Sequence, residues 1–428
     1  MTSATARTGN DTRLDPALVR RISKRVAPPL ILLYFIAFLD RVNVSFAALT
    51  MNRDLGISET LFGLAAGIFF LGYMLFAVPS NLVLMRVGAR RWIAVLMVIW
   101  GIVSGCMAFV HGPTMYIVLR FLIGAAEAGF FPGVILYLTY WLPGSARAGI
   151  MALFTFSVPL SSVVGSPISA RLLQMHGLHG LAGWQWLFLL EALPAIAVGL
   201  CVPFILPPGP REVSWLSAAE KQTLLDTIAH EDRKLVTATH IRLPITPVVV
   251  ACAIYFLYAV GLYELGFWVP KLLSSHGVSL ARLGWITAIP FGIGALGMFL
   301  WSNFSDRIRE REFNLAGAFL AGALGMTITA LAASVPTAVM GLSLAAIGIF
   351  AALPIFWASF SQRIAPVHAA VAIATVNSIG NVGGFLGPYA TGWLLQHTHN
   401  YAAGLLATAA CLFAGMLMVL VRKMRTNV

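Results

Sequence analysis

The stretch FLDRVNVSF, residues 38–46, places an acid and a base in a run that is otherwise apolar or small from Pro28 to Leu49. The whole chain has a similar character, because 59% of its 428 residues are hydrophobic and only 10% are charged. A charge at the centre of a bilayer costs at least ~2.5–3.5 kcal/mol by insertion scales, so such charges mark an ion-pair network or a transport path. The composition predicts a membrane protein, and this stretch indicates where its function lies.

Apolar segments long enough to cross a membrane recur along the chain. A hydrocarbon core of about 30 Å needs roughly 20 apolar residues per helix. Twelve such segments are predicted, at 28–50, 60–84, 91–111, 114–141, 148–173, 184–206, 245–273, 283–303, 314–333, 335–358, 367–395 and 400–421. The sequence therefore predicts an all-α membrane protein with twelve transmembrane helices in two six-helix bundles.

One long polar interruption divides the chain into similar halves. The predicted parts are a cytoplasmic arm at 1–27, an N-terminal bundle at 28–206, a cytoplasmic linker at 207–244, a C-terminal bundle at 245–421 and a cytoplasmic tail at 422–428. In the linker, SWLSAAEKQTLLDTIAHEDRK combines a Ser cap with helix formers and predicts a short surface helix. The arm has no apolar core of a signal peptide, and we expect it to be disordered.

Basic residues are distributed unevenly over the predicted loops. With the N-terminus in the cytoplasm, 22 of the 28 Lys and Arg residues lie on the cytoplasmic side, 4 on the opposite side and 2 inside the membrane. This asymmetry follows the positive-inside rule, so both termini should be cytoplasmic. Topology and anionic membrane lipid explain the net charge of +12, and no nucleic-acid partner is predicted.

The motifs of the common membrane enzymes and pumps are missing from the sequence. It contains no Walker A, GxSxG or HExxH pattern. The cysteines fall in separate apolar segments without CxxC spacing, and the histidines of HGLHG (176–180) and HTH (397–399) have no acid or thiol at metal-ligand spacing. We predict no metal, no cofactor and no enzymatic activity, and a monomer. A nutrient sensor would need a signalling domain, which the sequence does not contain.

Six charged residues lie inside the predicted helices: Asp40, Arg41, Arg120, Glu127, Glu191 and Glu264. Arg120 and Glu127 are seven residues apart, about two turns and ~10 Å of rise on one helical face. We expect the first and fourth helices to meet around Asp40, Arg41, Arg120 and Glu127. Glu264 is interpreted as a third titrating group, a gate residue or an acid in a wet vestibule. Glu191 is interpreted as part of a packing contact.

The chemistry of the central charges suits an anion coupled to protons. An arginine is always charged and its planar fork fits a carboxylate, so Arg41 and Arg120 are predicted to bind an anionic substrate. A carboxyl group in a partly dry environment is easier to protonate than one in water, so Asp40 and Glu127 are predicted proton sites. Protonation of an acid would free its arginine for the substrate. The alternative is a static lattice of two acids and two bases.

Polar residues in other helices complete the predicted substrate site. Asn377 and Asn381 lie in the glycine-rich NSIGNVGGFLGPYATGW, and their amides suit hydroxyls or a carboxylate. Ser359 in PIFWASF and Tyr73 in FLGYMLF are further candidates. Hydrogen bonding between helices is the alternative role for the asparagines and Ser359, and packing or anchoring at the membrane interface is the alternative role for Tyr73.

Several motifs resemble those of a known family. RVGARR at 86–91 and SDRIRER at 305–311 occupy equivalent places in the two halves and resemble the loop signature of the major facilitator superfamily, although Met85 replaces the signature Asp of the first half. FLDRVNVSFA, RFLIGAAEAGFFPG, GWQWLFLLEALPA, FWVPKLL and NSIGNVGGFLGPYATGW resemble its anion:cation symporter family, over about residues 28–421. Members of that family take up organic acids with protons.

The resemblance implies roles for individual residues. Arg41 and Arg120 match the family's substrate-anion positions, and Asp40 and Glu127 match its proton-coupling pair. Tyr73 and Asn381 match substrate contacts of sugar-acid members, and Ala77 replaces a glutamate found in many relatives.

We therefore expect a secondary transporter of the bacterial inner membrane that works by proton symport and alternating access. Its expected substrate is a small organic anion: a hydroxylated carboxylate, dicarboxylate or sugar acid such as tartrate, glucarate or galactonate. The alternatives are an aromatic-acid:proton symporter and a proton-exchanging exporter of organic anions.

Overall fold

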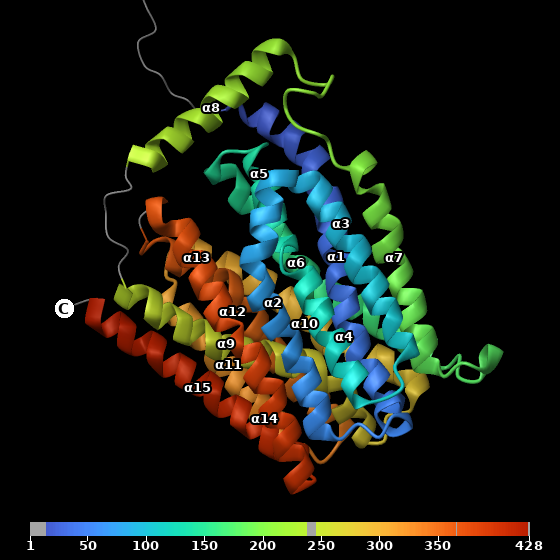
Figure 1. The fold of residues 1–428 in the computed structure, drawn as a ribbon. Coiled ribbons are helices and arrows are strands. Elements are labelled where there is room, and N and C mark those ends of the chain that lie inside the picture. The colour runs from blue at the N-terminus through green and yellow to red at the C-terminus, as the bar shows by residue number, and fades with distance from the viewer. Residues whose placement is uncertain (1–13, 238–244, 365, 427–428) are drawn as a thin grey trace, which may run out of the picture.

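The computed structural model describes residues 14–237, 245–364 and 366–426, and in this part of the chain all regular structure is helical (Figure 1). The N-terminal half contains α1 (Pro16–Asp54), α2 (Glu59–Val87), α3 (Ala89–Cys106), η1 (Met107–Phe109), α4 (Pro113–Glu127), α5 (Phe130–Thr139), α6 (Gly144–Leu173), η2 (Leu178–Gly180) and α7 (Gly183–Ile205). The rest comprises α8 (Ala218–Thr237), α9 (Ile245–Ser275), α10 (Leu280–Ile308), α11 (Glu312–Ala330), α12 (Val335–Ser361), α13 (Pro366–Gly380), α14 (Val382–Thr398) and α15 (Tyr401–Thr426).

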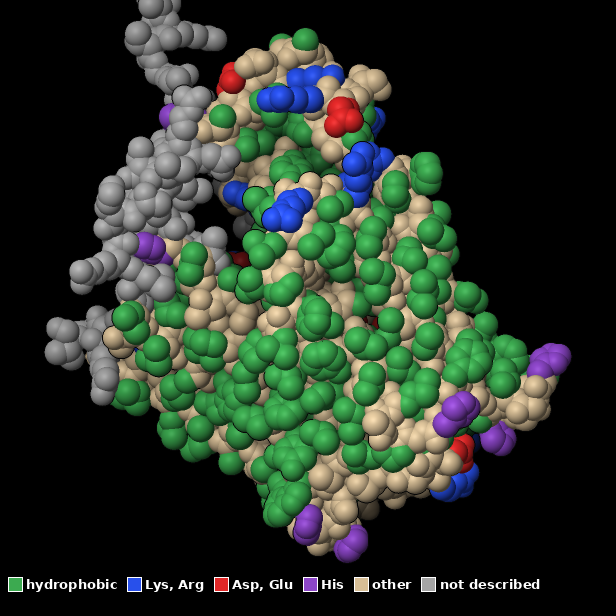
Figure 2. Space-filling model, in the orientation of Figure 1, with side chains coloured by type: hydrophobic (Ala, Val, Ile, Leu, Met, Phe, Trp, Pro, Cys, Tyr) green, Lys and Arg blue, Asp and Glu red, His purple; other side chains and the backbone are tan. Residues whose placement is uncertain are grey.

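The helices have the length and composition of membrane spans. Within the described ranges, 10 candidate spans meet these criteria, with α4 and α5 counted together. The predicted fifth and eleventh spans correspond to α6 and to the pair α13 and α14. On the face seen in Figure 2, an apolar belt separates the basic side chains near α8 from the histidines at the other end. The prediction of an all-α membrane protein is confirmed.

The two ends of the molecule are named here by their landmarks. The linker end is the end at which α8 lies, and the far end is the opposite one, where α1 ends and α2 begins (Figure 1). These names carry no statement about the sides of the membrane.

Helix α1 begins earlier than the sequence predicted. Residues 16–27 are helical, so the expectation of a disordered arm is wrong for this part, while residues 1–13 lie outside the described ranges. The Asp15 side chain caps the helix by accepting a hydrogen bond from the Ala17 amide at 2.9 Å. Leu18, Ile22 and Val26 recur every four residues and are buried, which gives the first turns of α1 an apolar face.

The linker carries the predicted surface helix, α8. The Ser217 hydroxyl accepts a hydrogen bond from the Glu220 amide at 3.2 Å, which caps the helix as the sequence predicted. Glu220 also forms an ion pair with Arg21 of α1, and Trp215 stacks on Trp141 with ring centroids 5.6 Å apart. The Ser217 backbone amide and the Arg21 guanidinium lower the pKa of Glu220. These contacts dock α8 on the N-terminal half.

Two of the predicted continuous spans are broken. The fourth is interrupted between Glu127 and Phe130, where Gly129 precedes the start of α5. The eleventh is interrupted at Asn381, whose side-chain amide donates to the Asn377 carbonyl at 2.7 Å. Breaks of this kind expose backbone groups in a membrane only where side chains or a polar site can bind them. Both breaks lie beside residues that the sequence singled out.

The two halves of the chain pack closely at the far end. Gly63 of α2 has no room for a Cβ because the Pro388 carbonyl of α14 lies against it. Gly392 of α14 similarly meets the backbone of Glu59. On the other side of the molecule a Cβ on Gly284 of α10 would lie 2.6 Å from the Ser166 carbonyl of α6. The far end is therefore closed by backbone-to-backbone contacts between the halves.

Candidate functional site

An ion pair between α1 and the end of α4 forms the core of the site. Arg41 donates to one carboxylate oxygen of Glu127, through Nη2 at 2.7 Å and Nε at 3.2 Å. The Arg41 side chain is 20% exposed, whereas that of Glu127 is 3% exposed. The other oxygen of Glu127 has no hydrogen-bond partner among the described residues. A partly accessible guanidinium is thus held from one side by a buried acid.

Phe69 of α2 lies close to both of the arginines predicted to bind substrate. The guanidinium carbon of Arg41 is 5.0 Å from the centre of this ring, and that of Arg120 is 5.1 Å from it. Arg120 is buried, and its Nε donates to the Ala65 carbonyl at 3.2 Å. Its guanidinium also lies 5.9 Å from the Phe267 ring of α9. The aromatic ring therefore fixes two cations beside the boundary between the halves.

The C-terminal half contributes a hydrogen-bonded chain of amides and tyrosines. The Tyr263 hydroxyl donates to the side-chain oxygen of Asn381 at 3.3 Å, and the Asn381 amide donates to that of Asn377 at 3.2 Å. The Tyr255 hydroxyl donates to the same Asn377 oxygen at 3.3 Å. Tyr263 lies within electrostatic reach of Arg41, so the chain links the two halves of the molecule.

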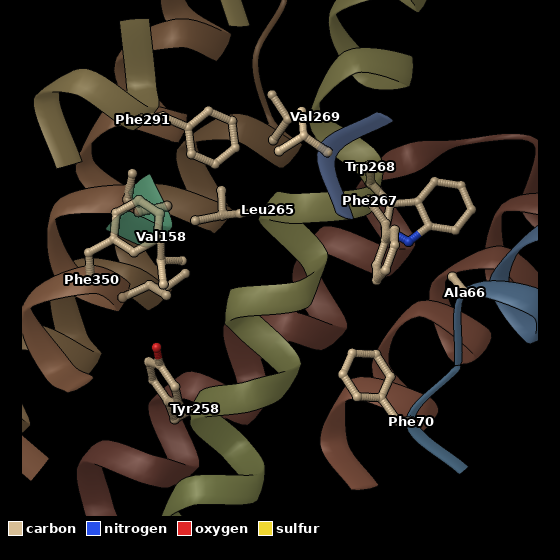
Figure 3. Packing of buried hydrophobic residues seen from close by; sticks show 14 of the residues in the cluster. Ala66, Phe70, Val158, Tyr258, Leu265, Phe267, Trp268, Val269, Phe291 and Phe350 are labelled. Carbon is tan, nitrogen blue, oxygen red and sulfur yellow. The ribbon is translucent and has the colours of Figure 1, made fainter. Parts of the chain in front are cut away.

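Aromatic contacts reinforce this junction. The ring centroids of Phe70 in α2 and Tyr263 in α9 are 4.3 Å apart, and those of Tyr73 and Phe69 are 6.4 Å apart. Figure 3 shows Phe267 and Trp268 of α9 pointing toward the part of α2 that carries Phe70. Tyr73, Asn377 and Asn381 are partly exposed.

The hydrogen bonds of Asp40 lie apart from this group, although its carboxyl group interacts electrostatically with Glu127 and Arg120. Its Oδ1 accepts hydrogen bonds from Asn43 at 3.0 Å and from Ser104 of α3 at 2.9 Å. Its Oδ2 has no hydrogen-bond partner within the described ranges, and the residue is 5% exposed. The structure thus brings Arg41, Arg120 and Glu127 together, and it places Asp40 inside the N-terminal half.

Ser359 also lies apart from the central group. Its hydroxyl donates to Glu312 at 2.5 Å, and Glu312 forms ion pairs with Arg363 at 3.0 Å and Arg422 at 2.5 Å. These residues bind the start of α11 to the ends of α12 and α15. The environment of Ser359 is therefore a charged network within the C-terminal half.

Phe69 and Tyr263 are site residues that the sequence analysis did not select. Phe69 is four residues before Tyr73 on α2, so helical spacing placed the two on one face. Tyr263 directly precedes Glu264 in the sequence. No sequence signal distinguishes an aromatic ring that contacts two cations from one that packs against lipid.

The comparisons with known proteins agree with this architecture. The model of the Major Facilitator Superfamily matches residues 30–388 and again residues 250–427. A protein of Agrobacterium vitis, named as a proposed tartrate transporter, is 47% identical over 95% of this chain and 92% of its own length. The quinolone resistance transporter of Acinetobacter baumannii is 35% identical over 94% of each chain.

A solved structure shares the fold. The xylose transporter XylE of E. coli superposes with a TM-score of 0.71 at 14% identity, over 92% of this chain and 97% of that chain. The chain belongs to the major facilitator superfamily, as the loop motifs predicted. It is a membrane transporter and not an enzyme.

Proposed function

We propose that this protein imports a small organic anion together with protons. The observation that carries the proposal is the pair of guanidiniums on Phe69, one of them partly exposed and neutralised by a single buried acid. The similarity to a protein named as a proposed tartrate transporter supports a hydroxylated carboxylate, dicarboxylate or sugar acid as the substrate.

In this proposal, proton binding and anion binding are coupled because Glu127 and the substrate carboxylate compete for Arg41. When Glu127 accepts a proton, it no longer neutralises Arg41, and the guanidinium fork becomes available to a substrate carboxylate. Arg120 supplies a second cation, and Asn377, Asn381 and Tyr73 offer hydrogen bonds to substrate hydroxyls. Asp40 is the second proton site in this proposal, because its buried Oδ2 has no hydrogen-bond partner among the described residues.

Alternating access requires two bodies that move about the site. In the proposal these are the bundles at 28–206 and 245–421, joined by the linker at 207–244. The excess of basic residues in the loops at the linker end supports a cytoplasmic position for that end and for both termini, in a bacterial inner membrane. The closed far end is then the outer gate.

Two alternative functions are supported by specific observations, one with another substrate and one with the opposite direction of transport. The rings of Phe69, Phe70 and Tyr263 beside the arginines favour an aromatic acid. Export of an organic anion by proton exchange is favoured by the similarity to a quinolone resistance transporter. Both use the same arginines, and they differ in ligand and direction.

Thermal-shift measurements on the purified protein test the proposal. The panel contains tartrate, glucarate, galactonate, hexuronates, phthalate, hydroxyphenylacetate and a quinolone, each at acid and neutral pH. A ligand that binds the folded state stabilises it by RT ln(1 + [L]/Kd), so a true substrate at 100-fold excess over Kd contributes about 2.7 kcal/mol.

The outcomes separate the candidates. Stabilisation by hydroxylated acids alone supports the leading proposal, whereas stabilisation by phthalate or the quinolone alone supports one of the two alternatives. Arg120→Ala is the matched control, since it should melt as a folded protein and be stabilised by the anion much less than the wild type is. If no anion stabilises the protein, the central charges form a static lattice and the proposal is wrong.

A further inference from the structure

Glu264 of α9 is a buried acid that the proposed substrate site does not use. It is 1% exposed, and its Oε2 accepts a hydrogen bond from Thr391 of α14 at 2.8 Å. Its Oε1 has no hydrogen-bond partner, and no ion pair of Glu264 occurs, among the described residues. The carboxyl group is therefore enclosed in the C-terminal half without a counter-charge.

The surroundings of Glu264 favour its neutral form. The side chains that face it are Thr391 from α14, Thr408, Cys411, Leu405 and Tyr401 from α15, Met326 from α11, Leu342 from α12 and Trp268 from α9 itself. Of these only Cys411 and Tyr401 titrate, and neither carries a positive charge. An ionised carboxylate in such a place is costly, whereas a neutral carboxyl group needs only the hydroxyls that are present.

Two cavities near the far end share Tyr401 as a lining residue, and one of them is lined by Glu264. A cavity of about 400 Å³ at this end is lined by residues of both halves, including Glu59, Lys271 and Tyr401. A second cavity, of about 10 Å³, lies beside Glu264 and is also lined by Tyr401. Tyr401 thus lines both the large cavity and the small cavity beside Glu264.

The same small cavity adjoins the contact that closes the far end. Trp268 lines it, and the Trp268 ring meets the edge of Phe62 in α2 with centroids 5.3 Å apart. Lys271, one turn further along α9, lies 5.3 Å from the Trp268 ring and forms an ion pair with Glu59 of α2. A charge on Glu264 would therefore appear directly behind the closed interface.

We propose that Glu264 is a proton-binding site, separate from the Arg41–Glu127 pair, that exchanges its proton through the far end and whose neutral form stabilises the closure of that end. This inference rests on the proposed function in one respect: the proposed topology places the far end on the outer side of the membrane, so the proton is exchanged with the outside. Acidification outside then favours closure, and loss of this proton favours opening.

Glu191 provides a matched control in the other half of the chain. It is 4% exposed, and the Ser169 hydroxyl of α6 donates to it at 2.7 Å. It shares with Glu264 the burial and the hydroxyl donor, but it does not line the cavities that Tyr401 separates. Glu191→Gln should remove a buried carboxyl without affecting the far end.

Infrared spectroscopy of the purified protein in lipid nanodiscs, without any organic anion, tests the protonation. The carboxylic-acid carbonyl band is followed as the pH is raised. We expect one component that disappears reversibly, is missing in Glu264→Gln and persists in Glu191→Gln. Thr391→Val retains the acid and should move the frequency of this component. If Glu264→Gln leaves the spectrum unchanged, or if the component never titrates, the acid carries no exchangeable proton and the proposal is wrong.

A distance measurement tests the link to the far end. Spin labels are attached to the far ends of α2 and α14 and their separation is measured over the same pH range. The wild type should open as the band disappears, Glu191→Gln should follow it, and Glu264→Gln should stay closed. A separation that does not respond to pH in the wild type overturns the proposal. Neither experiment requires a substrate, so failure to find one in the anion panel leaves these results interpretable.

Discussion

Arg41 donates both of its hydrogen bonds in the site to one oxygen of Glu127, so a single proton on that acid changes the partner of the arginine. At this scale the two acids that the sequence grouped differ in their hydrogen-bond partners. Glu127 is paired with Arg41, whereas Asp40 accepts hydrogen bonds from Asn43 and Ser104. Their substitutions should therefore have different consequences.

Glu127→Gln should uncouple protons from substrate. The amide has nearly the size of the acid but cannot gain or lose a proton at physiological pH. We expect uptake driven by a pH gradient to be lost in proteoliposomes, while exchange of labelled for unlabelled substrate remains largely intact. Proton flux equal to that of the wild type would assign Glu127 a structural role only.

Arg120→Ala should weaken anion binding much more than it lowers the stability of the fold. A hydrogen bond to a charged group contributes about 1.5–3 kcal/mol, so losing this cation should weaken anion binding by roughly 10- to 100-fold. Isothermal titration measures the affinity and thermal melting measures the folded state. Arg120→Lys keeps the charge without the fork and should recover part of the affinity. Unchanged affinity in Arg120→Ala would exclude a direct contact with the substrate.

The sequence predicted the charged part of the site and missed its aromatic part. Arg120 and Glu127 could be found because charges are rare in membrane helices and a seven-residue spacing puts them on one face. Phe69 could not, because aromatic residues on a membrane helix have many roles and its partners come from α1 and α4. The position of Ser359 depends on Glu312, which is 47 residues away in the sequence.

At the scale of helices, the close approach of α2 to α14 depends on glycine. Gly63 of α2 faces the backbone of Pro388, and Gly392 of α14 faces the backbone of Glu59. Backbone atoms cannot move aside as a flexible side chain can. A side chain at either glycine must separate the two helices.

Gly63→Val should prevent closure of the far end. We expect transport to be lost, and a membrane-impermeant thiol reagent should react faster with a cysteine introduced at Ser275, which lines the far-end cavity. Gly266→Ala on α9 is the control, because no atom lies within 4 Å of the position of its added Cβ. Normal transport by Gly63→Val would show that the halves do not need this contact.

Helix number was predictable from the sequence, but helix continuity was not. The count follows from apolar length, which the bilayer fixes. The breaks at Gly129 and Asn381 have no counterpart in the apolar pattern, and the bond from the Asn381 side chain to the Asn377 carbonyl is visible only in the folded chain. The helical start of α1 was missed because its apolar face packs on the linker, whose position only the fold provides.

At the scale of the whole molecule, Lys271 and Glu59 form an ion pair that joins the halves at the far end. The Lys271 side chain is 8% exposed and that of Glu59 is 33% exposed. A pair held in this way is screened less than one on the surface. It should stabilise one of the two states of the transport cycle.

Lys271→Met should shift the resting population toward an open far end by roughly tenfold, which corresponds to about 1.4 kcal/mol. Spin-label distances across the far ends of α2 and α14 measure this population. The double substitution Glu59→Lys with Lys271→Glu restores the attraction and should restore the wild-type distances. If the single and double variants both resemble the wild type, the pair does not contribute to closure.

Helix α2 carries the Glu59 and Gly63 contacts of the far end, and it also carries the Ala65 carbonyl and the Phe69 ring that hold Arg120. Ligand affinity and the equilibrium between the open and closed far end are then linked through a single helix, and such linkage is reciprocal. If a bound anion changes the open–closed equilibrium constant, the anion must bind the two states with different affinities. A cross-link that holds the protein in one state should therefore change the dissociation constant of the anion.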